Sequence, residues 1–496
     1  MSGKTSSAVL LRVYGFLFPP LGLVMLWLGG RSLGRRIFGT LVLLLYCIPY
    51  TALILWLLIR FTGLEVEWRG GYLPAFTYSK TVPNFDAVER SRAEQAKNAI
   101  PTNRADSFPP AYWTDFRGPN RDGHYDEMPI LTNWPVAGPR ELWRQPVGGG
   151  YGSFVVAAGM AFTIEQRWDW EVAVAYDLAT GREVWTNGWA AHFQESMGGD
   201  GPRATPTYHE GRIFAQGAEG DLQCLEAATG KRIWSRNILA DNQAENLTWG
   251  IASSPLIVDD KLIVMPGGTN GRTVAAYAWA SGEPAWHALD DGGAYDSLMA
   301  VTLAGQRQLL AVTSRQAVGL AVEDGKLLWE HPWVVAMDNR DIAQPVVISS
   351  NRFFLSAGYG TGCEVVEIGK TADGWTERTV WKNKQLKNKF SSSVFWRGYV
   401  YGLDEDILTC LNAETGERQW KDGRYGFGQV LLADGQLVIL CGEGDLALVR
   451  ASPEGWDERA RFPAIHGKTW NVPAIAQGKL LVRNAVEMAC YDLSGK

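Results

Sequence analysis

The segment Ala175-Tyr-Asp-Leu-Ala-Thr-Gly-Arg-Glu-Val-Trp185 decides the fold, because related segments recur along the chain. Each one joins an apolar strand to a turn that ends in glycine, and a tryptophan follows four residues after that glycine. The segments that keep this spacing end at Trp185, Trp234, Trp286, Trp329 and Trp420, and divergent copies end at Trp381 and Phe462. Their mean period of about 46 residues is typical of a β-propeller whose blades have four strands each.

A second element precedes each of these turns and predicts the remaining strands of a blade. Apolar and polar residues alternate between Gly- and Asp-containing turns in the segments that begin at Ala204, Ser254 and Val472. Such alternation is typical of half-buried antiparallel strands joined by hairpins. The chain after the amino-terminal region is therefore predicted to be all-β.

The two ends of the repeat region complement each other. The last copy stops at Lys496 without a fourth strand, and the segment Glu141–Val147, which contains Trp143, has the pattern of the missing strand. We expect Glu141–Val147 to pair with Glu487–Asp492. The fold class predicted is an eight-bladed β-propeller closed by strands from both termini, which leaves no free sheet edge.

The amino-terminal region predicts a membrane anchor with one or two transmembrane helices. Residues 37–59 form a run of 23 residues without a charge, which is long enough to cross a hydrocarbon core of about 30 Å. Residues 13–30 form a shorter apolar run interrupted by Pro19-Pro20, so this run either spans the membrane or forms a re-entrant or interfacial segment. Three arginines between 31 and 36 favour a cytoplasmic link, although Lys4 and Arg12 oppose it.

This arrangement predicts the domain order and the cellular location. We expect a membrane anchor in residues 1–63, in contact with lipid, and a connector in 64–134 with a short helix between Asp86 and Ala99. The connector ends in a turn-rich segment, Trp113–Gly123, that is expected to cap the propeller in 135–496. With the arginine link inside, the propeller lies on the periplasmic, extracytoplasmic side of the inner membrane.

From about Trp134 to Lys496 the repeat resembles that of the pyrroloquinoline-quinone (PQQ) propeller superfamily. The segment Phe116–Gly123 is similar to one in membrane-anchored bacterial PQQ-like proteins. The superfamily holds periplasmic quinoprotein dehydrogenases and also a non-catalytic outer-membrane assembly lipoprotein. The resemblance implies that the repeat tryptophans pack one blade against the next, at Trp143, Trp185, Trp234, Trp286, Trp329, Trp381 and Trp420.

Charge and cysteine content narrow the function. A net charge of -6 argues against a nucleic-acid partner. Cys224, Cys410 and Cys490 occupy a slot where other blades carry Ala or Gly, so they are predicted to be buried and unpaired. No adjacent Cys-Cys pair is present, although quinoprotein alcohol dehydrogenases typically carry that disulfide beside the cofactor. The scattered histidines predict no metal site.

A candidate site follows from the topology of a propeller. The connection from the outer strand of one blade to the inner strand of the next crosses one face and reaches the axial channel. Aromatic and charged residues in these connections predict a ligand site at the channel mouth. The alternative is that they cap turns and bond between blades. The residues predicted to bind ligand are Arg203, Trp249, Tyr295, Asn339, Lys389 and Trp470.

Two functions from different classes remain open at this stage. The first is a non-catalytic scaffold or ligand-binding module with an envelope protein partner, and the sequence favours it. The second is a PQQ-dependent dehydrogenase with calcium. In the second, Trp470 would stack on the quinone and Asn339 would ligate calcium, while Asp296 would act as the base. The catalytic residues are unknown, and the scaffold reading needs no cofactor.

Overall fold

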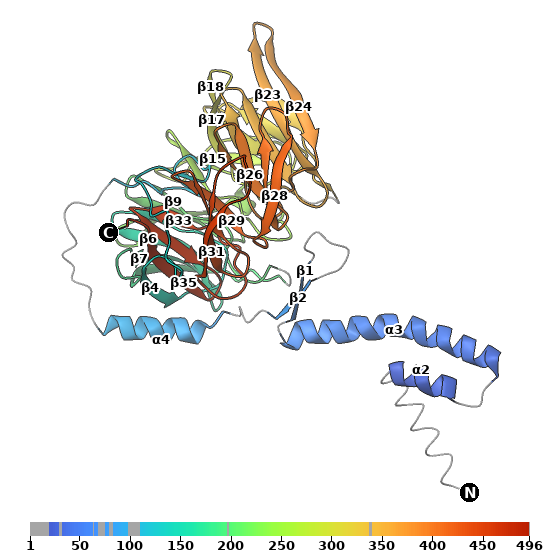
Figure 1. The fold of residues 1–496 in the computed structure, drawn as a ribbon. Coiled ribbons are helices and arrows are strands. Elements are labelled where there is room, and N and C mark those ends of the chain that lie inside the picture. The colour runs from blue at the N-terminus through green and yellow to red at the C-terminus, as the bar shows by residue number, and fades with distance from the viewer. Residues whose placement is uncertain are drawn as a thin grey trace. The chain divides into compact units, whose positions relative to one another are not determined.

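The structure is a computed structural model that describes residues 19–28, 32–62, 64–67, 75–78, 83–97, 110–195, 198–336 and 340–495. The chain divides into two compact units, Met1–Lys80 and Thr81–Lys496. The first unit contains helices and a β-hairpin, and the second contains a β-propeller with short helices (Figure 1).

Among the described residues of the first unit, one helix could cross a membrane. Its elements are α2 (Pro19–Leu28), α3 (Leu33–Thr62), β1 (Leu64–Glu67) and β2 (Ala75–Tyr78). Helix α3 has 30 residues and a mean hydropathy of 2.4 in its most apolar window, none of which is buried. A core helix would bury such a surface, so α3 is a candidate span that contains the predicted run 37–59.

The predicted span at residues 13–30 is described only in part. Helix α2 has ten residues, which makes it about 15 Å long, or half of the hydrocarbon core. The indole N–H of Trp27 in α2 donates a hydrogen bond to Thr40 in α3 at 3.0 Å. Residues 13–18, 29 and 30 lie outside the described residues.

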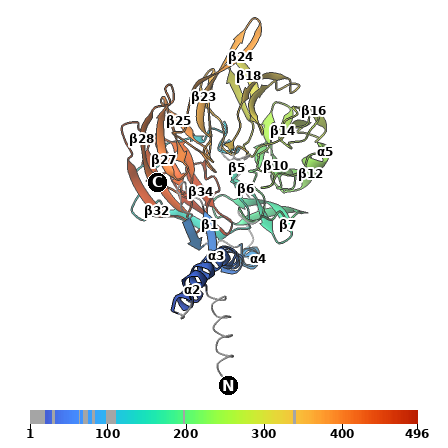
Figure 2. The same ribbon diagram turned by 90° about the vertical axis from the view of Figure 1, so that its right-hand side faces the viewer.

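The second unit contains eight antiparallel sheets, which form a ring of blades around an axis (Figure 2). We number the blades from 1 to 8 along the chain, starting at β5. Blade 1 consists of β5 (Val155–Ala157), β6 (Met160–Arg167), β7 (Trp170–Asp177) and β8 (Glu183–Ala190), and blade 2 of β9 (Thr207–His209), β10 (Arg212–Gln216), β11 (Asp221–Glu226) and β12 (Arg232–Asn237). Blade 3 consists of β13 (Leu256–Val258), β14 (Lys261–Val264), β15 (Val274–Ala278) and β16 (Pro284–Ala288), and blade 4 of β17 (Met299–Leu303), β18 (Gln306–Val312), β19 (Gln316–Leu320) and β20 (Leu327–Pro332).

The remaining blades repeat this four-stranded plan. Blade 5 consists of β21 (Val346–Ser349), β22 (Arg352–Ala357), β23 (Gly362–Thr371) and β24 (Gly374–Asn383), and blade 6 of β25 (Val394–Trp396), β26 (Tyr399–Asp404), β27 (Ile407–Asn412) and β28 (Arg418–Arg424). Blade 7 consists of β29 (Gln429–Ala433), β30 (Gln436–Leu440), β31 (Asp445–Arg450) and β32 (Glu458–Pro463), and blade 8 of β33 (Ala474–Ala476), β34 (Lys479–Arg483), β35 (Glu487–Asp492) and β4 (Glu141–Pro146). Two helices, α4 (Phe85–Ala96) and α5 (Ile238–Asp241), and the strand β3 (His124–Tyr125) complete the unit.

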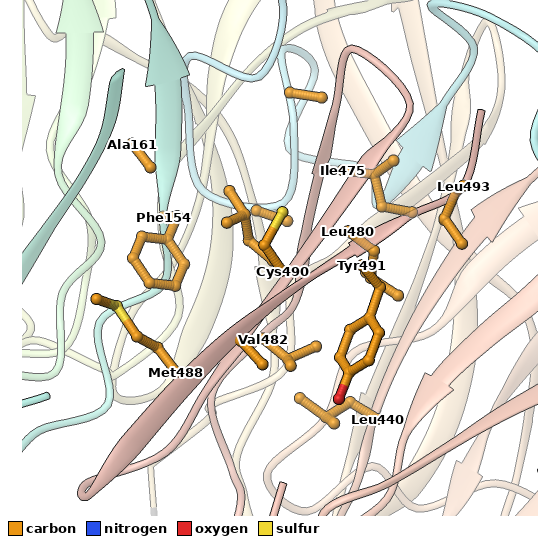
Figure 3. Close-up of a cluster of buried hydrophobic side chains, with 14 of the residues drawn as sticks. Phe154, Ala161, Leu440, Ile475, Leu480, Val482, Met488, Cys490, Tyr491 and Leu493 are labelled. Carbon is orange, nitrogen blue, oxygen red and sulfur yellow. The ribbon is translucent and has the colours of Figure 1, made fainter. Parts of the chain in front are cut away.

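Blade 8 confirms the predicted closure of the ring. Strand β4 pairs antiparallel with β35, and Trp143 lies opposite Cys490. Behind this pairing, apolar side chains from blades 7, 8 and 1 form one buried cluster. Figure 3 shows part of it, with Met488 and Cys490 of β35 on the side of Phe154 and with Tyr491 near Leu440. The two termini of the propeller thus share one core.

The repeat tryptophans contact the following blade. The indole N–H of Trp185 donates to the carbonyl of Ala227 at 2.9 Å, and Trp143 donates in the same way to Leu178 at 3.1 Å. Gly230 has a φ of +72°, and a Cβ there would lie 2.4 Å from the Trp185 ring. Glycine is therefore required at this turn both for its positive φ and for the close approach of the indole.

Blades 4 and 5 are joined differently. Blade 5 has a long hairpin, β23–β24, in place of the glycine turn (Figure 1), and Trp329 donates to Gln308 of its own blade at 2.6 Å. Trp329 still packs against Phe353 of blade 5, with the ring centroids 5.5 Å apart. In addition, His331 bridges the blades, at 2.7 Å from Glu364 and 2.6 Å from Glu377. Burial lowers the pKa of His331, but the hydrogen bonds and the charges of the two glutamates together raise it by more, so the pKa lies above its usual value.

The segment of residues 110–127, here called the plug segment, fills the axial channel from one end. Its backbone accepts hydrogen bonds from Val156, Tyr208 and Leu432 on three inner strands. The Tyr125 hydroxyl accepts one from Gly478, in the turn between the first two strands of blade 8, at 3.0 Å. That turn lies at the end of the channel opposite the connections between blades, so the plug segment enters there.

Two arginines hold the plug segment in place. Arg121 is 2% exposed and donates to the carbonyls of Ser254 at 3.1 Å and Leu298 at 2.9 Å, in blades 3 and 4. Arg117 donates to the carbonyls of Ser393 and Val430, at the inner strands of blades 6 and 7. The plug segment therefore ties opposite sides of the ring together, in addition to capping it.

Candidate ligand-binding mouth of the axial channel

The mouth is defined as the end of the channel opposite the plug segment, where the connections lead into the inner strands. A belt of hydrogen bonds between neighbouring connections fixes their course. In each bond a backbone N–H donates to a side-chain oxygen of the next blade at 2.8–3.0 Å. The donor and acceptor pairs are Ser153–Thr205, Thr205–Ser254, Ser254–Ser297, Ser297–Gln344 and Gln344–Ser392. These bonds between blades satisfy buried backbone groups and place the adjacent side chains.

An aromatic stack from three blades lies at the mouth. The ring centroid of Trp470 is 4.6 Å from that of Phe390 and 5.6 Å from that of Tyr151, and both pairs are stacked. The Lys468 ammonium lies 3.8 Å from the centroid of Trp470. Offset stacking and cation–π contacts stabilise such a cluster. Trp470 is therefore held by the protein's own side chains.

Two cations extend this cluster on either side. The Lys389 ammonium lies 4.6 Å from the ring of Phe427 and 5.3 Å from that of Tyr359. The Arg203 guanidinium lies 4.5 Å from the ring of Phe193 and 5.6 Å from that of Tyr151. Burial lowers the pKa of Arg203, and neighbouring anionic groups only partly offset this effect.

Blades 3 and 4 contribute Trp249 and Tyr295. The Trp249 backbone N–H donates to the Tyr295 hydroxyl at 3.3 Å. Burial raises the pKa of Tyr295, while the charges of Arg340 and Arg203 lower it by less. Tyr295 thus lies within electrostatic range of arginines from blades 5 and 2.

The structure links most of the predicted site residues and adds others. Arg203 and Trp470 both contact Tyr151, Lys389 contacts Phe390 beside Trp470, and Trp249 contacts Tyr295. Asn339 lies outside the described residues. The residues that sequence reasoning missed are Tyr151, Phe193, Tyr359 and Phe427. Tyr151, Phe193 and Phe427 lie in connections between blades, whereas Tyr359 comes from the turn between β22 and β23.

Two buried carboxylates lie beside this cluster. Asp296 is 2% exposed, and neither of its carboxylate oxygens has a hydrogen-bond partner. Burial and the charge of Asp341 raise the pKa of Asp296 well above its usual range, and the backbone N–H groups of Val312 and of Asp296 itself offset only part of this rise. Burial also raises the pKa of Asp341 to about 6, although its carboxylate accepts a hydrogen bond from Trp333 at 2.6 Å.

PQQ with calcium fits this arrangement poorly. A quinone would have to displace Phe390, Tyr151 or Lys468 to stack on Trp470. Calcium takes six to eight oxygen ligands, and the described residues hold no group of three or more His, Cys, Asp or Glu side chains placed for a metal. Among the described residues, the orphaned carboxylate of Asp296 is a feature that would suit a cation.

The described cysteines are all free. Cys224, Cys410 and Cys490 are buried, as predicted from their slot in the repeat. Burial raises the pKa of the Cys224 thiol to about 11 and that of Cys410 to about 12. These thiols are therefore unreactive fillers of the blade core.

Comparisons with known proteins agree with this architecture. The model of the family described as outer membrane protein assembly factor BamB matches residues 169–422, just over half of the chain. The chain is 27% identical over 149 residues to the outer membrane protein assembly factor BamB of Shewanella oneidensis, covering 28% of this chain and 35% of that protein. It is 29% identical over 101 residues to the 1-butanol dehydrogenase (cytochrome c) of Thauera butanivorans, covering 20% of this chain and 14% of that protein. The chain thus spans about a third or less of these relatives.

A solved structure with the same fold is the quinohemoprotein alcohol dehydrogenase from Comamonas testosteroni. Its TM-score is 0.55 at 14% sequence identity, with 83% of this chain and 85% of that chain covered. At this identity the likeness shows the fold alone. Together with the apolar helix α3, the family match fits a membrane-associated protein of the cell envelope. The chain belongs to the PQQ-like β-propeller family described as outer membrane protein assembly factor BamB.

Proposed function

We propose that this protein is a membrane-anchored, extracytoplasmic propeller that acts as an interaction scaffold or ligand-binding module through its mouth. The observation that carries the proposal is the linked set of aromatic and cationic side chains at the mouth, from Arg203 through Trp470 to Lys389. Aromatic residues and arginine dominate the binding energy of protein interfaces. The plug segment closes the other end of the channel, so a partner would approach from the mouth.

The same proposal places the anchor in the inner membrane, with α3 as its span. Arg35 and Arg36 lie in the first turn of α3, and positive charge at one end of a span favours the cytoplasmic side. The carboxyl-terminal end of α3 and everything after it would then be extracytoplasmic. Partners of the mouth would be proteins of the cell envelope.

Fusions of reporter enzymes test this orientation. Alkaline phosphatase joined after Thr62 is expected to be active and green fluorescent protein at the same position dark, because both report export. Replacing Arg35 and Arg36 by glutamate should shift the ratio towards fluorescence, since the charge that retains this end of α3 is lost. A fluorescent, phosphatase-inactive fusion of the unchanged protein would place the propeller in the cytoplasm.

Site-specific photo-crosslinking in the cell envelope tests the mouth. A photo-reactive residue in place of Trp249 should give one discrete adduct with an envelope protein, and Arg203→Ala should reduce its yield several-fold because a cationic contact is lost. The matched control is the same residue in place of Lys231, which is exposed in a turn at the opposite end of blade 2. Equal adducts at both positions would contradict a specific site.

The dehydrogenase remains a second candidate because of Asp296, whose orphaned carboxylate suits either a cation or a general base. The purified chain, titrated with PQQ in the presence of calcium, distinguishes the two functions. The scaffold predicts no calcium-dependent change in PQQ absorbance. Saturable binding that Trp470→Ala abolishes, while circular dichroism shows an intact fold, would favour the enzyme.

A further inference from the structure

Two exposed tryptophans stand apart from the packing of the propeller. Trp168 and Trp170, at the turn between β6 and β7, are 52% and 50% exposed. Among the described residues of the propeller, Trp456 is the other exposed tryptophan, at 40%. Side chains this large are costly to leave in water, so a pair of them at one tip indicates a surface that contacts something apolar.

The conformation of Trp168 strengthens this reasoning. Its φ is +53°, in the left-handed region that a bulky residue rarely adopts. In several blades the short turn between the first and second strands also has a residue in this region. In three of them that residue is small or polar, namely Ala158, Asp259 or Ala304. A tryptophan here stays half exposed and has a backbone conformation that is unfavourable for a bulky residue. An exposed tryptophan in such a strained backbone conformation is best explained by a contact with another molecule.

Helix α4 adds a third aromatic residue to this tip. The ring of Phe85, the first residue of α4, lies 5.4 Å from the ring of Trp168. The helix is locked onto the propeller, because Arg92 donates to Glu183 at 3.0 Å and to the Tyr176 hydroxyl at 2.9 Å. The aromatic tip, defined as Phe85, Trp168 and Trp170, is therefore a rigid feature of the propeller.

The covalent chain limits the distance between this tip and the end of α3. The β1–β2 hairpin pairs Leu64 with Tyr78, so the chain between these residues adds no reach. About nine residues remain between Thr62 and Phe85, which extend at most about 36 Å when the width of the hairpin is included. A domain of about 360 residues has a radius of gyration of about 21 Å, so the tether is shorter than the propeller is wide.

We propose that the aromatic tip inserts into the interfacial region of the bilayer that α3 spans. This inference rests on the proposed anchoring by α3. Indole rings are enriched at the membrane interface because they combine an apolar body with one N–H donor. The tip includes Asp169, whose side chain is 87% exposed, and no exposed cation in its turn. Insertion therefore depends on the apolar rings and not on anionic lipid.

The experiment uses the full chain reconstituted into nanodiscs of zwitterionic phosphatidylcholine. A photo-crosslinking residue is placed at position 168 or 170, and lipid adducts are measured by mass spectrometry. We expect several-fold more lipid adduct at 168 and 170 than at position 456, and no further gain when anionic lipid is added. Trp456 is the matched control because it is 40% exposed in a turn between third and fourth strands, at the opposite end of a blade.

The outcomes separate this inference from the proposed anchoring. Failure of the chain to enter nanodiscs, with the protein folded in detergent, would contradict both. A reconstituted protein with equal lipid adducts at positions 168 and 456 would overturn the inference alone. Adducts of position 168 with a second protein chain in place of lipid would assign the tip to a protein interface and would also overturn it.

Discussion

Replacing β4 is expected to destroy the closed ring. In the full chain, a Gly–Ser sequence of equal length in place of Glu141–Pro146 would leave β35 as an unpaired edge and remove Trp143 from its place over Gly181. An exposed hydrophobic edge strand templates aggregation, and the core shared by blades 7, 8 and 1 would open. We expect the melting temperature, followed by circular dichroism in detergent, to fall by at least about 10 °C, and the protein to form oligomers in size-exclusion chromatography.

A replacement of the same length elsewhere provides the control. The tip of the β23–β24 hairpin, Lys370–Trp375, is mostly exposed, and its backbone pairs only within the hairpin. Its side chains reach the neighbouring blade and core through the hydrogen bond from Lys370 to Gln306 and the packing of Trp375. The same Gly–Ser sequence there should therefore lower the melting temperature by much less than the replacement of β4. If both replacements gave similar monomeric proteins, strand β4 would not be what closes the ring.

Arg121→Met is expected to have the second largest effect. Arg121 and Asp115 form an ion pair at 3.0 Å, yet burial lowers the pKa of Arg121 and raises that of Asp115, so desolvation of the pair is not fully repaid. Without the arginine, the Asp115 carboxylate loses its ion-pair partner. The carbonyls of Ser254 and Leu298 each lose a hydrogen-bond donor. Loss of one partner of a buried pair costs about 3–5 kcal/mol, or about 4–7 °C in melting temperature for a domain of this size.

Arg140→Met is the matched control for this change. Arg140 also forms an ion pair, with Asp492 at 2.7 Å, but its side chain is 70% exposed. Exposed pairs contribute about 0–1 kcal/mol, so the melting temperature should hardly move. Equal melting temperatures for Arg121→Met and Arg140→Met would show that the plug segment does not hold the ring together.

The repeat region could be predicted from the sequence because most blades share the same local interactions. The glycine turn and the tryptophan four residues later interact with the adjacent blade, so their spacing survives in Trp185 and its equivalents. Closure by Glu141–Val147 followed because a blade without its fourth strand leaves an unpaired edge. The join between blades 4 and 5 was not predictable, since His331 meets Glu364 and Glu377 only after β23 and β24 have paired.

The candidate site also has residues that could be predicted from the sequence and residues that could not. Connections between blades must reach the channel in any propeller, so Arg203, Lys389 and Trp470 could be selected from their place in the chain. Tyr359 was missed because it comes from a turn within blade 5, and no local pattern marks which turns lean over the mouth. That Trp470 stacks between Phe390 and Tyr151 depends on three blades meeting at once.

The all-β repeat, the number of blades, the closing strand and the buried cysteines could be predicted from the sequence, because each follows from local periodicity and from the rule that strands must be paired. What fills the channel could not be predicted, because it depends on the assembled ring. Arg117 and Arg121 look in the sequence like solvated charges in a turn, yet both are buried against inner-strand carbonyls of blades 3, 4, 6 and 7. These carbonyls come close to one another only when the whole ring has assembled. The environment of the two arginines therefore cannot be read from any single stretch of the sequence.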